Sequence, residues 1–364
     1  MKKVLITCGG TGGHIYPGIA IASKIVEHDS DAKILFIGTK QGMENRLVPA
    51  AGFEIKGIDA SGIDRHNLLK NFKTLENSIR GSHEAAKIIK EFAPDIAIGT
   101  GGYVTGTVIM QAHKQGIPCF IHEQNAVPGL TNKMLERFAS KLFISFPESA
   151  EHFRHPEKTV LTGNPIRGEF SSLDRSECRK KLGLGDETFI LLFGGSLGAE
   201  VLNEACLDLI SKLPESGVKL CFVTGKRYYP EICKKLEKSG LNKPSLMLLD
   251  YADNMPELMT ASDIIISRAG AIAVSEILAC GKPSVLVPSP NVTNNHQYHN
   301  AKSIADRNAA LLAEEKDIVG NYGKFSETVL KLANDRERIN EMSKAARKIA
   351  VTDAAEKIWQ GLGI

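Results

Sequence analysis

The chain has 364 residues, of which 43% are hydrophobic and 24% are charged, and its formal net charge at pH 7 is +3. This composition is typical of a globular protein with two domains of about 150–200 residues each. The charge is too small to indicate a nucleic-acid partner. Seven scattered cysteines, and no apolar run near the roughly 20 residues that span a bilayer, predict a cytoplasmic protein with reduced thiols.

Short apolar runs alternate with helical patterns in the first half of the chain. The runs cover residues 4–6, 34–37, 96–98, 119–121 and 142–144. The longest helical stretch runs from about residue 67 to residue 92. Such alternation predicts a parallel sheet with helices on both faces.

Turn residues cluster at residues 162–165, and we place a domain boundary there, which gives domains 1–164 and 165–349. The second half repeats the alternation, with apolar runs at residues 189–193, 220–223, 246–249, 264–266, 284–287 and 310–312. The sequence therefore predicts an α/β protein with two Rossmann-like domains.

Three glycine-rich turns each follow an apolar run: CGGTGGHIYPG (8–18), GTGGYVTG (99–106) and GGSLGAE (194–200). Such turns let backbone N–H groups approach a phosphate or a sugar at the start of a helix. None has the G-x-G-x-x-G spacing with a following acidic residue, and no GxxxxGK is present, so nicotinamide and P-loop sites are excluded. The turns predict two nucleotide-type domains that face a shared cleft.

Three side chains near these turns are candidates for chemistry. His14 follows paired glycines at the start of a predicted helix. A neutral imidazole there can remove a proton from a hydroxyl, and the alternative is a histidine that only caps backbone groups of the loop. Ser196 suits a diphosphate, although a serine here is also an ordinary helix cap. Arg167 suits phosphate oxygens, and its alternative is an ordinary surface arginine.

The segment SRAGAIAVSE (267–276) is the most specific stretch of the chain. It predicts a strand end, a turn of small residues and a helix carrying Glu276, whose carboxylate can accept hydrogen bonds from two ribose hydroxyls. The loop 291–300 that follows is rich in amides, which suit sugar hydroxyls. Asp29-Ser30-Asp31 has the form of a metal-binding D-x-D motif but is interpreted as a solvated turn, so no metal site and no cofactor are predicted.

Together these residues resemble the MurG family, which transfers N-acetylglucosamine from UDP-N-acetylglucosamine to undecaprenyl-linked lipid I and so forms lipid II. The resemblance rests on GGTGGHIYPG, GTGGYVTG, IHEQNAVPGLTNK (121–133), TGNPIR (162–167), GGSLGA, SRAGAIAVSE and HQYHNA (296–301). It implies the GT-B architecture, with the acceptor lipid on domain 1–164 and the UDP-sugar on domain 165–349. It also implies that a final helix, about 350–364, packs back on the first domain.

The resemblance implies a role for each matching position. Near the reacting sugars it places Thr11, Gly12, Gly13 and His14, with Tyr103 on the acceptor side and Asn125 on the donor sugar. For the nucleotide it implies Arg167, Ser196, the backbone at Ala252, and the run Ala271, Ile272, Ala273, Val274, Ser275 and Glu276. For N-acetylglucosamine it implies Gln297 and Asn300, while His296 stands where the family often has a glutamine.

The expected reaction is attack by the 4-hydroxyl of the muramoyl sugar on C1 of the donor sugar, with inversion. His14 is the candidate base, and the helix that begins after Ser196 stabilises the departing UDP without a metal. Two alternatives from other classes are a UDP-N-acetylglucosamine 2-epimerase and a non-catalytic protein that binds UDP-sugars.

A lipid acceptor requires the protein to work at the cytoplasmic face of the membrane as a peripheral protein. The segment 65–80 offers Leu68, Leu69 and Phe72 at helical spacing, with Lys70 and Lys73 interleaved. Such a stripe is also typical of any core-facing helix, but Leu68 and Leu69 are adjacent and point in different directions. The sequence therefore predicts a membrane patch made of these five residues.

Overall fold

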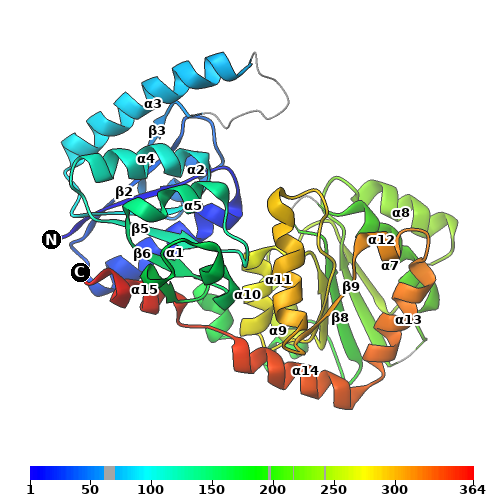
Figure 1. Ribbon diagram of the computed structural model, residues 1–364. Helices are drawn as coiled ribbons and strands as arrows, with labels where there is room; N and C mark the ends of the chain where they lie inside the picture. The colour runs from blue at the N-terminus through cyan, green and yellow to red at the C-terminus, as the bar shows by residue number, and fades with distance from the viewer. Residues whose placement is uncertain (61–69, 196–197, 216, 242) are drawn as a thin grey trace. The chain divides into compact units, whose positions relative to one another are not determined.

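A computed structural model describes residues 1–60, 70–195, 198–215, 217–241 and 243–364, without the side chains of residues 70–78 and 171 (Figure 1). Over these residues the chain divides into two compact units. One consists of Met1–Ile166 with Thr352–Ile364, and the other is Arg167–Val351.

The first unit is built on a seven-stranded sheet over its described residues, in the order β3-β2-β1-β4-β5-β6-β7. All its neighbouring strands are parallel. The strands are β1 (Lys3–Cys8), β2 (Lys33–Thr39), β3 (Glu54–Ile58), β4 (Ile96–Gly101), β5 (Cys119–Glu123), β6 (Ala139–Ile144) and β7 (Thr159–Leu161). Because β1 lies between β2 and β4, the strand order reverses there. In open parallel sheets, ligands bind beside such a point, at the carboxyl ends of the strands.

Helices cover both faces of this sheet (Figure 1). They are α1 (Gly12–His28), α2 (Glu44–Ala50), α3 (Lys70–Phe92), α4 (Tyr103–Lys114), α5 (Leu130–Leu135) and α15 (Ala354–Leu362). Short 3₁₀ turns are η1 (Glu136–Phe138), η2 (Pro147–His152) and η3 (Pro156–Lys158). Successive strand residues serve opposite faces: Leu5 packs with α3 and α4, whereas Val4 and Ile6 pack with α1 and α15. Both faces are therefore buried, which is why these strands are continuous apolar runs.

Two strands of this sheet, β3 and β7, were not predicted from the sequence. Both lie at the edges of the sheet, and both are only partly buried. The first reads EIKGI and the second TVL. An edge strand needs less apolar surface than a central one, so its sequence carries a weaker signal.

The second unit is built on a six-stranded parallel sheet over its described residues, in the order β10-β9-β8-β11-β12-β13. Its strands are β8 (Thr188–Phe193), β9 (Val218–Val223), β10 (Leu246–Leu249), β11 (Ile264–Ser267), β12 (Ser284–Leu286) and β13 (Ala310–Leu312). Each predicted apolar run of this half forms one of these strands. The central strand β8 is buried along its whole length.

The helices of the second unit surround this sheet (Figure 1). They are α6 (Arg175–Lys181), α7 (Glu200–Lys212), α8 (Tyr229–Lys238), α9 (Met255–Ala261), α10 (Ala271–Ala279), α11 (His296–Ala305), α12 (Glu315–Ile318), α13 (Tyr322–Ala333) and α14 (Arg336–Ile349), with the 3₁₀ turns η4 (Gly168–Ser171) and η5 (Thr293–Asn295). The predicted fold class, an α/β chain with two parallel-sheet domains of Rossmann type, is confirmed.

The last helix, α15, belongs to the first unit although the chain reaches it from the second. The Trp359 indole stacks on the His28 imidazole of α1, with ring centroids 3.6 Å apart. His28 Nε2 also lies 2.8 Å from Glu356 Oε2. Ile358 and Leu362 are buried in the core beneath. None of the helices among the described residues combines the length and the apolar character that crossing a membrane requires.

Candidate functional site

The first glycine turn, between β1 and α1, packs directly against the second, between β4 and α4. The Gly9 N–H donates to the Gly101 carbonyl oxygen at 3.2 Å. Gly101 and Gly102 have φ angles of +115° and +91°, and a Cβ on Gly102 would lie 2.4 Å from the Gly9 carbonyl oxygen. Only glycine fits both the backbone angles and the space. The two turns thus form one compact surface at the carboxyl ends of β1 and β4.

His14 lies on this surface, in the first turn of α1. Its Nδ1 is 3.1 Å from the Gly9 carbonyl oxygen and 3.4 Å from Thr11 Oγ1. Because a carbonyl only accepts, Nδ1 carries the proton of the neutral ring, and the basic lone pair is on Nε2. A Cβ on Gly101 would lie 2.9 Å from Nε2, so the glycine makes room for the imidazole. The predicted residues Thr11, Gly12, Gly13 and His14 are therefore together at one edge of the sheet.

A buried network behind this surface fixes the backbone of His14. Thr100 Oγ1 donates to the His14 carbonyl oxygen at 2.7 Å, and the Gln124 amide donates to the Thr100 carbonyl. The same amide lies 3.1 Å from His122 Nδ1, while His122 Nε2 lies 3.2 Å from the Gly163 carbonyl oxygen. His122 is fully buried, and burial lowers its pKa from the ordinary 6.5 to about 4. His122 is therefore neutral and structural at pH 7.

This buried histidine predicts a loss of stability in acid. Between about pH 6.5 and pH 4, the unfolded chain binds a proton at His122 that the folded chain does not, so stability falls as the pH falls. From pH 7 to about pH 5 we expect the native protein to lose roughly 2 kcal/mol more unfolding free energy than His122→Gln. Urea unfolding of both proteins at the two pH values measures this difference. Equal losses would contradict a neutral buried His122.

Glu123 organises the loop that carries Asn125. Its Oε1 accepts from the Asn125 N–H at 2.9 Å and from Asn125 Nδ2 at 3.2 Å. Its Oε2 accepts from Asn132 Nδ2 at 2.8 Å and from the Gly129 N–H at 3.0 Å. One buried carboxylate therefore holds both ends of the loop between β5 and α5. The assignment of Asn125 to the donor sugar stays a prediction.

Sequence reasoning gave no individual roles to His122, Glu123 and Gln124. The sequence does contain a sign of their importance, which is three consecutive polar residues at the end of an apolar strand. Polar groups buried at such a place must be hydrogen-bonded. That pattern identifies buried polar groups but not their partners, since Gly163 and Thr100 are distant in the chain.

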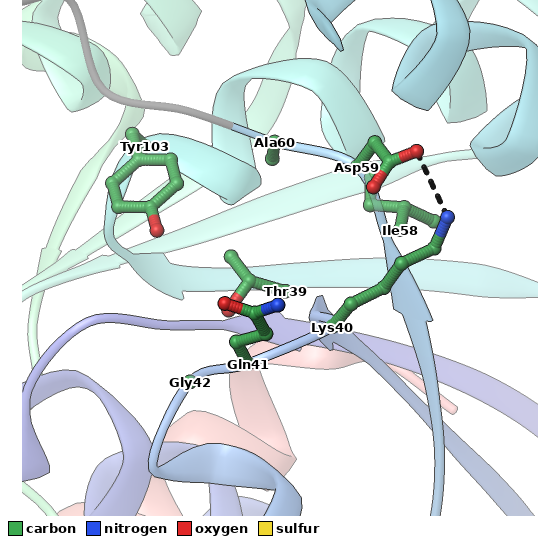
Figure 2. A pocket seen from close by; sticks show the side chains of 8 residues that line it. All are labelled: Thr39, Lys40, Gln41, Gly42, Ile58, Asp59, Ala60 and Tyr103. Carbon is green, nitrogen blue, oxygen red and sulfur yellow. Dashed lines mark ion pairs between the residues drawn. The ribbon is translucent and has the colours of Figure 1, made fainter.

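Tyr103 begins α4, and the residue is 43% exposed. It lines a pocket of about 330 Å³ together with residues 39–42 and 58–60 (Figure 2). The residue predicted for the acceptor side therefore borders a cavity, whose walls come from the ends of β2 and β3.

In the second unit, the third glycine turn connects β8 to α7. Gly195 and Gly198 have φ angles of +89° and +75°, and a Cβ on Gly194 would lie 2.6 Å from the Ala199 nitrogen. The turn is thus as crowded as those of the first unit and leads into a helix of 13 residues. Ser196 lies outside the described residues, and its role at a diphosphate stays a prediction.

Two predicted nucleotide contacts, Arg167 and Glu276, pair with each other. Arg167 Nε lies 3.2 Å from Glu276 Oε1. The Glu276 side chain is only 13% exposed, so burial raises the pKa of its carboxyl while the Arg167 guanidinium opposes that rise. Arg167 itself is 41% exposed and also lies over the Phe170 ring. The pair places a cation and an acceptor-only group beside the start of α10.

The amide-rich segment uses its side chains to hold its own backbone. Gln297 Oε1 accepts from the Ser289 N–H at 2.9 Å. Asn300 is fully buried, and its Nδ2 donates to the Ala269 carbonyl oxygen at 3.1 Å, under the turn that leads into α10. His296 Nδ1 lies 2.9 Å from the Thr293 carbonyl oxygen. These bonds connect the segment to the Glu276 region, while the predicted contacts to N-acetylglucosamine stay predictions.

The other predicted nucleotide contacts lie on the second unit. Ala252 follows β10 with its side chain buried, and its predicted contact with the nucleotide through the backbone stays a prediction. In α10, Ala271 and Val274 are buried, Ile272 and Ala273 are half-buried, and Ser275 Oγ donates to the Ala271 carbonyl oxygen. Leu68 and Leu69 lie outside the described residues, and Lys70, Phe72 and Lys73 are described only by the backbone of α3.

Comparisons with known proteins agree over nearly the whole chain. The family profile of the glycosyltransferase family 28 N-terminal domain matches residues 4–144, and that of the family 28 C-terminal domain matches residues 189–358. A protein of Acetivibrio thermocellus, named UDP-N-acetylglucosamine–N-acetylmuramyl-(pentapeptide) pyrophosphoryl-undecaprenol N-acetylglucosamine transferase, is 42% identical over 360 residues. That alignment covers 98% of this chain and 96% of the relative.

Solved structures share the fold over nearly the whole length of the chain. The crystal structure of Acinetobacter baumannii MurG superimposes with a TM-score of 0.80 at 28% identity, covering 100% of this chain and 99% of that one. A UDP-GlcNAc 2-epimerase of Neisseria meningitidis bound to UDP-GlcNAc gives 0.70 at 14% identity, covering 100% and 99%. At that identity the second likeness shows a shared fold alone. The two parallel-sheet units, the three glycine turns and the full-length identity show that this chain belongs to the MurG family of GT-B glycosyltransferases.

Proposed function

We propose that this chain transfers N-acetylglucosamine from UDP-N-acetylglucosamine to the 4-hydroxyl of the muramoyl sugar of lipid I, which gives lipid II for peptidoglycan synthesis. The observation that carries this proposal is the 42% identity, over 98% of the chain, to a transferase named for these two substrates. Cell shape and division depend on this pathway.

In the proposed step, the acceptor hydroxyl oxygen forms a bond to C1 of the donor sugar. The bond from C1 to the diphosphate oxygen breaks, and UDP leaves with the electron pair. His14 Nε2 takes the hydroxyl proton, since Nδ1 is occupied by its bond to Gly9. Attack on the face opposite the leaving group inverts C1.

On the donor side, Glu276 accepts from the two ribose hydroxyls, and Arg167 with the turn at Ser196 holds the diphosphate. The 3.2 Å contact between Arg167 and Glu276 supports this assignment, because ribose and diphosphate are adjacent parts of one nucleotide. Backbone N–H groups at the start of α7 would stabilise the charge on departing UDP.

The experiment is to incubate the protein with UDP-N-acetylglucosamine and a lipid I analogue, and to follow UDP release and the anomeric configuration of the product. Acceptor-dependent release with a β-linked product from the α-linked donor supports an inverting transferase. Conversion of the donor to its C2 epimer without acceptor would indicate the epimerase. Tight UDP binding without turnover would indicate a binding protein.

We also propose that the protein attaches to the cytoplasmic face of the membrane through the patch of Leu68, Leu69, Lys70, Phe72 and Lys73. A membrane-linked acceptor is presented at the bilayer surface, and each basic residue near an anionic leaflet contributes about 1 kcal/mol. The triple variant Leu69→Glu, Lys70→Glu, Lys73→Glu should therefore bind anionic vesicles at least about 30-fold more weakly, measured by co-sedimentation.

The matched control is Lys87→Glu with Lys90→Glu, which changes the same helix near its other end. This control should sediment with vesicles like the native protein. If the triple variant also sediments normally, the attachment surface lies elsewhere.

A further inference from the structure

The pocket beside Tyr103 lies at the same sheet edge as His14. Its walls are the turn after β2 (39–42), the end of β3 (58–60) and Tyr103 at the start of α4, and its volume is about 330 Å³ (Figure 2). Because β1 lies between β2 and β4, the glycine turn that leads to His14 occupies the same edge. A substrate group that reaches His14 therefore has this pocket beside it.

The floor of the pocket is held by a buried carboxylate. Glu44 is fully buried, and its Oε1 accepts from the Thr39 N–H at 2.8 Å and from Thr39 Oγ1 at 2.7 Å. A Cβ on Gly42 would lie 2.1 Å from Glu44 Oε2, and one on Gly38 would lie 2.5 Å from its Cγ. The turn after β2 is thus closed tightly around Glu44. Such a fixed wall lowers the ordering cost of binding a ligand.

One wall carries the ion pair of Lys40 with Asp59, and each of these two residues also pairs with a charged residue of α3. Lys40 Nζ lies 2.9 Å from Asp59 Oδ2 and 2.7 Å from Glu84 Oε1, and Arg80 Nε lies 2.7 Å from Asp59 Oδ2. Hydrogen bonds to Glu84 and Asp59 raise the pKa of Lys40, so it stays cationic. Among the described lining residues, the wall therefore offers one positive and one negative group, which balance each other.

Other groups of the pocket retain hydrogen-bonding capacity. Figure 2 shows the Tyr103 ring across the pocket from the Lys40–Asp59 pair, with its hydroxyl directed towards Thr39 and Gln41. Within the described part of the chain, neither the exposed Gln41 amide nor the Tyr103 hydroxyl has a hydrogen-bond partner. An ammonium has three N–H donors, and Lys40 directs two of them at carboxylates.

From these features we propose that this pocket binds the peptide part of the acceptor. This inference rests on the proposed function, since the acceptor in the name of the Acetivibrio thermocellus relative carries a pentapeptide. A peptide presents both donors and acceptors along its backbone, together with charged groups. Gln41, Tyr103 and the Lys40–Asp59 pair supply the matching amide, hydroxyl and paired charges.

The same charges argue against the acceptor's diphosphate as the occupant. A diphosphate brings several negative charges, whereas the described residues that line the pocket carry one cation, Lys40, already paired with one carboxylate, Asp59. A mixed-charge wall suits a ligand that itself carries mixed polar groups.

The test compares two lipid-linked acceptor analogues, one with the pentapeptide and one without it, by their kcat/KM for UDP release. Lys40→Met keeps an unbranched side chain of similar length and removes its charge. Gln41→Ala changes an exposed side chain that has no hydrogen-bond partner among the described residues. The measured quantity is a ratio, kcat/KM for the peptide-bearing acceptor divided by kcat/KM for the peptide-free acceptor. Each variant should lower this ratio by about tenfold, because it removes about one hydrogen bond to the peptide. Lys114→Met, exposed at the end of α4, should keep the native ratio.

Each outcome has one meaning. An unchanged ratio in both pocket variants overturns the inference. This holds if the kcat/KM values for both acceptors fall together, as a structural or diphosphate role would cause, and also if both values stay native. Absence of UDP release by the native protein with either acceptor would instead contradict the proposed function. Release with a normal ratio in Lys40→Met and Gln41→Ala leaves the function intact and removes the peptide subsite.

Discussion

His14→Ala is expected to lower the turnover number by about 10²–10⁴-fold, the usual contribution of a general base, and to leave UDP affinity nearly unchanged. Nδ1 of His14 is committed to the Gly9 carbonyl oxygen, so Nε2 is the basic atom that this substitution removes. Steady-state kinetics with a lipid I analogue and calorimetric titration with UDP measure the two quantities.

The matched control for His14 is His83→Ala, which removes an exposed imidazole on α3 of the same unit. It should keep native turnover. The acid limb of the kcat profile, which reports protonation of the base, should disappear in His14→Ala only. Normal turnover in His14→Ala would reduce the residue to a loop cap.

Glu276→Ala is expected to weaken UDP-sugar binding by roughly ten- to 150-fold and to leave the acceptor KM unchanged. The carboxylate is mostly buried, and hydrogen bonds to a charged group contribute about 1.5–3 kcal/mol. Isothermal titration with UDP-N-acetylglucosamine gives the affinity. Glu327→Ala, an exposed carboxylate on α13, is the control and should bind normally.

A modified ligand separates two roles of Glu276, because the residue also pairs with Arg167. UDP lacking the 2′-hydroxyl should bind the native protein more weakly than UDP, whereas Glu276→Ala should bind the two ligands equally. If the variant still distinguishes them, Glu276 acts by holding Arg167 and not by contacting the ribose. Native affinity for both ligands in the variant would remove Glu276 from the site.

Much of the fold was predictable from the order of residues. Strands buried on both faces, such as β8, must be continuous apolar runs, and turns that crowd backbone against backbone, such as Gly101-Gly102, must be glycine. Burial of a strand and crowding of a turn each restrict the residue types at neighbouring positions, so both can be recognised from a short stretch of sequence. The edge strands β3 and β7 have weaker requirements, and they were missed.

The site depended more on tertiary structure, because its contacts join residues far apart in the chain. His122 is neutral because it is buried between Gln124 and Gly163, and Arg167 meets Glu276 across 109 positions. The peptide pocket is formed by three segments that are separate in the chain: the turn after β2, the end of β3 and the start of α4. The first of these is held by Glu44. A linear pattern can show that a residue is polar in an apolar context. Its partner, its burial and therefore its protonation state follow only when the sheet order brings distant segments together.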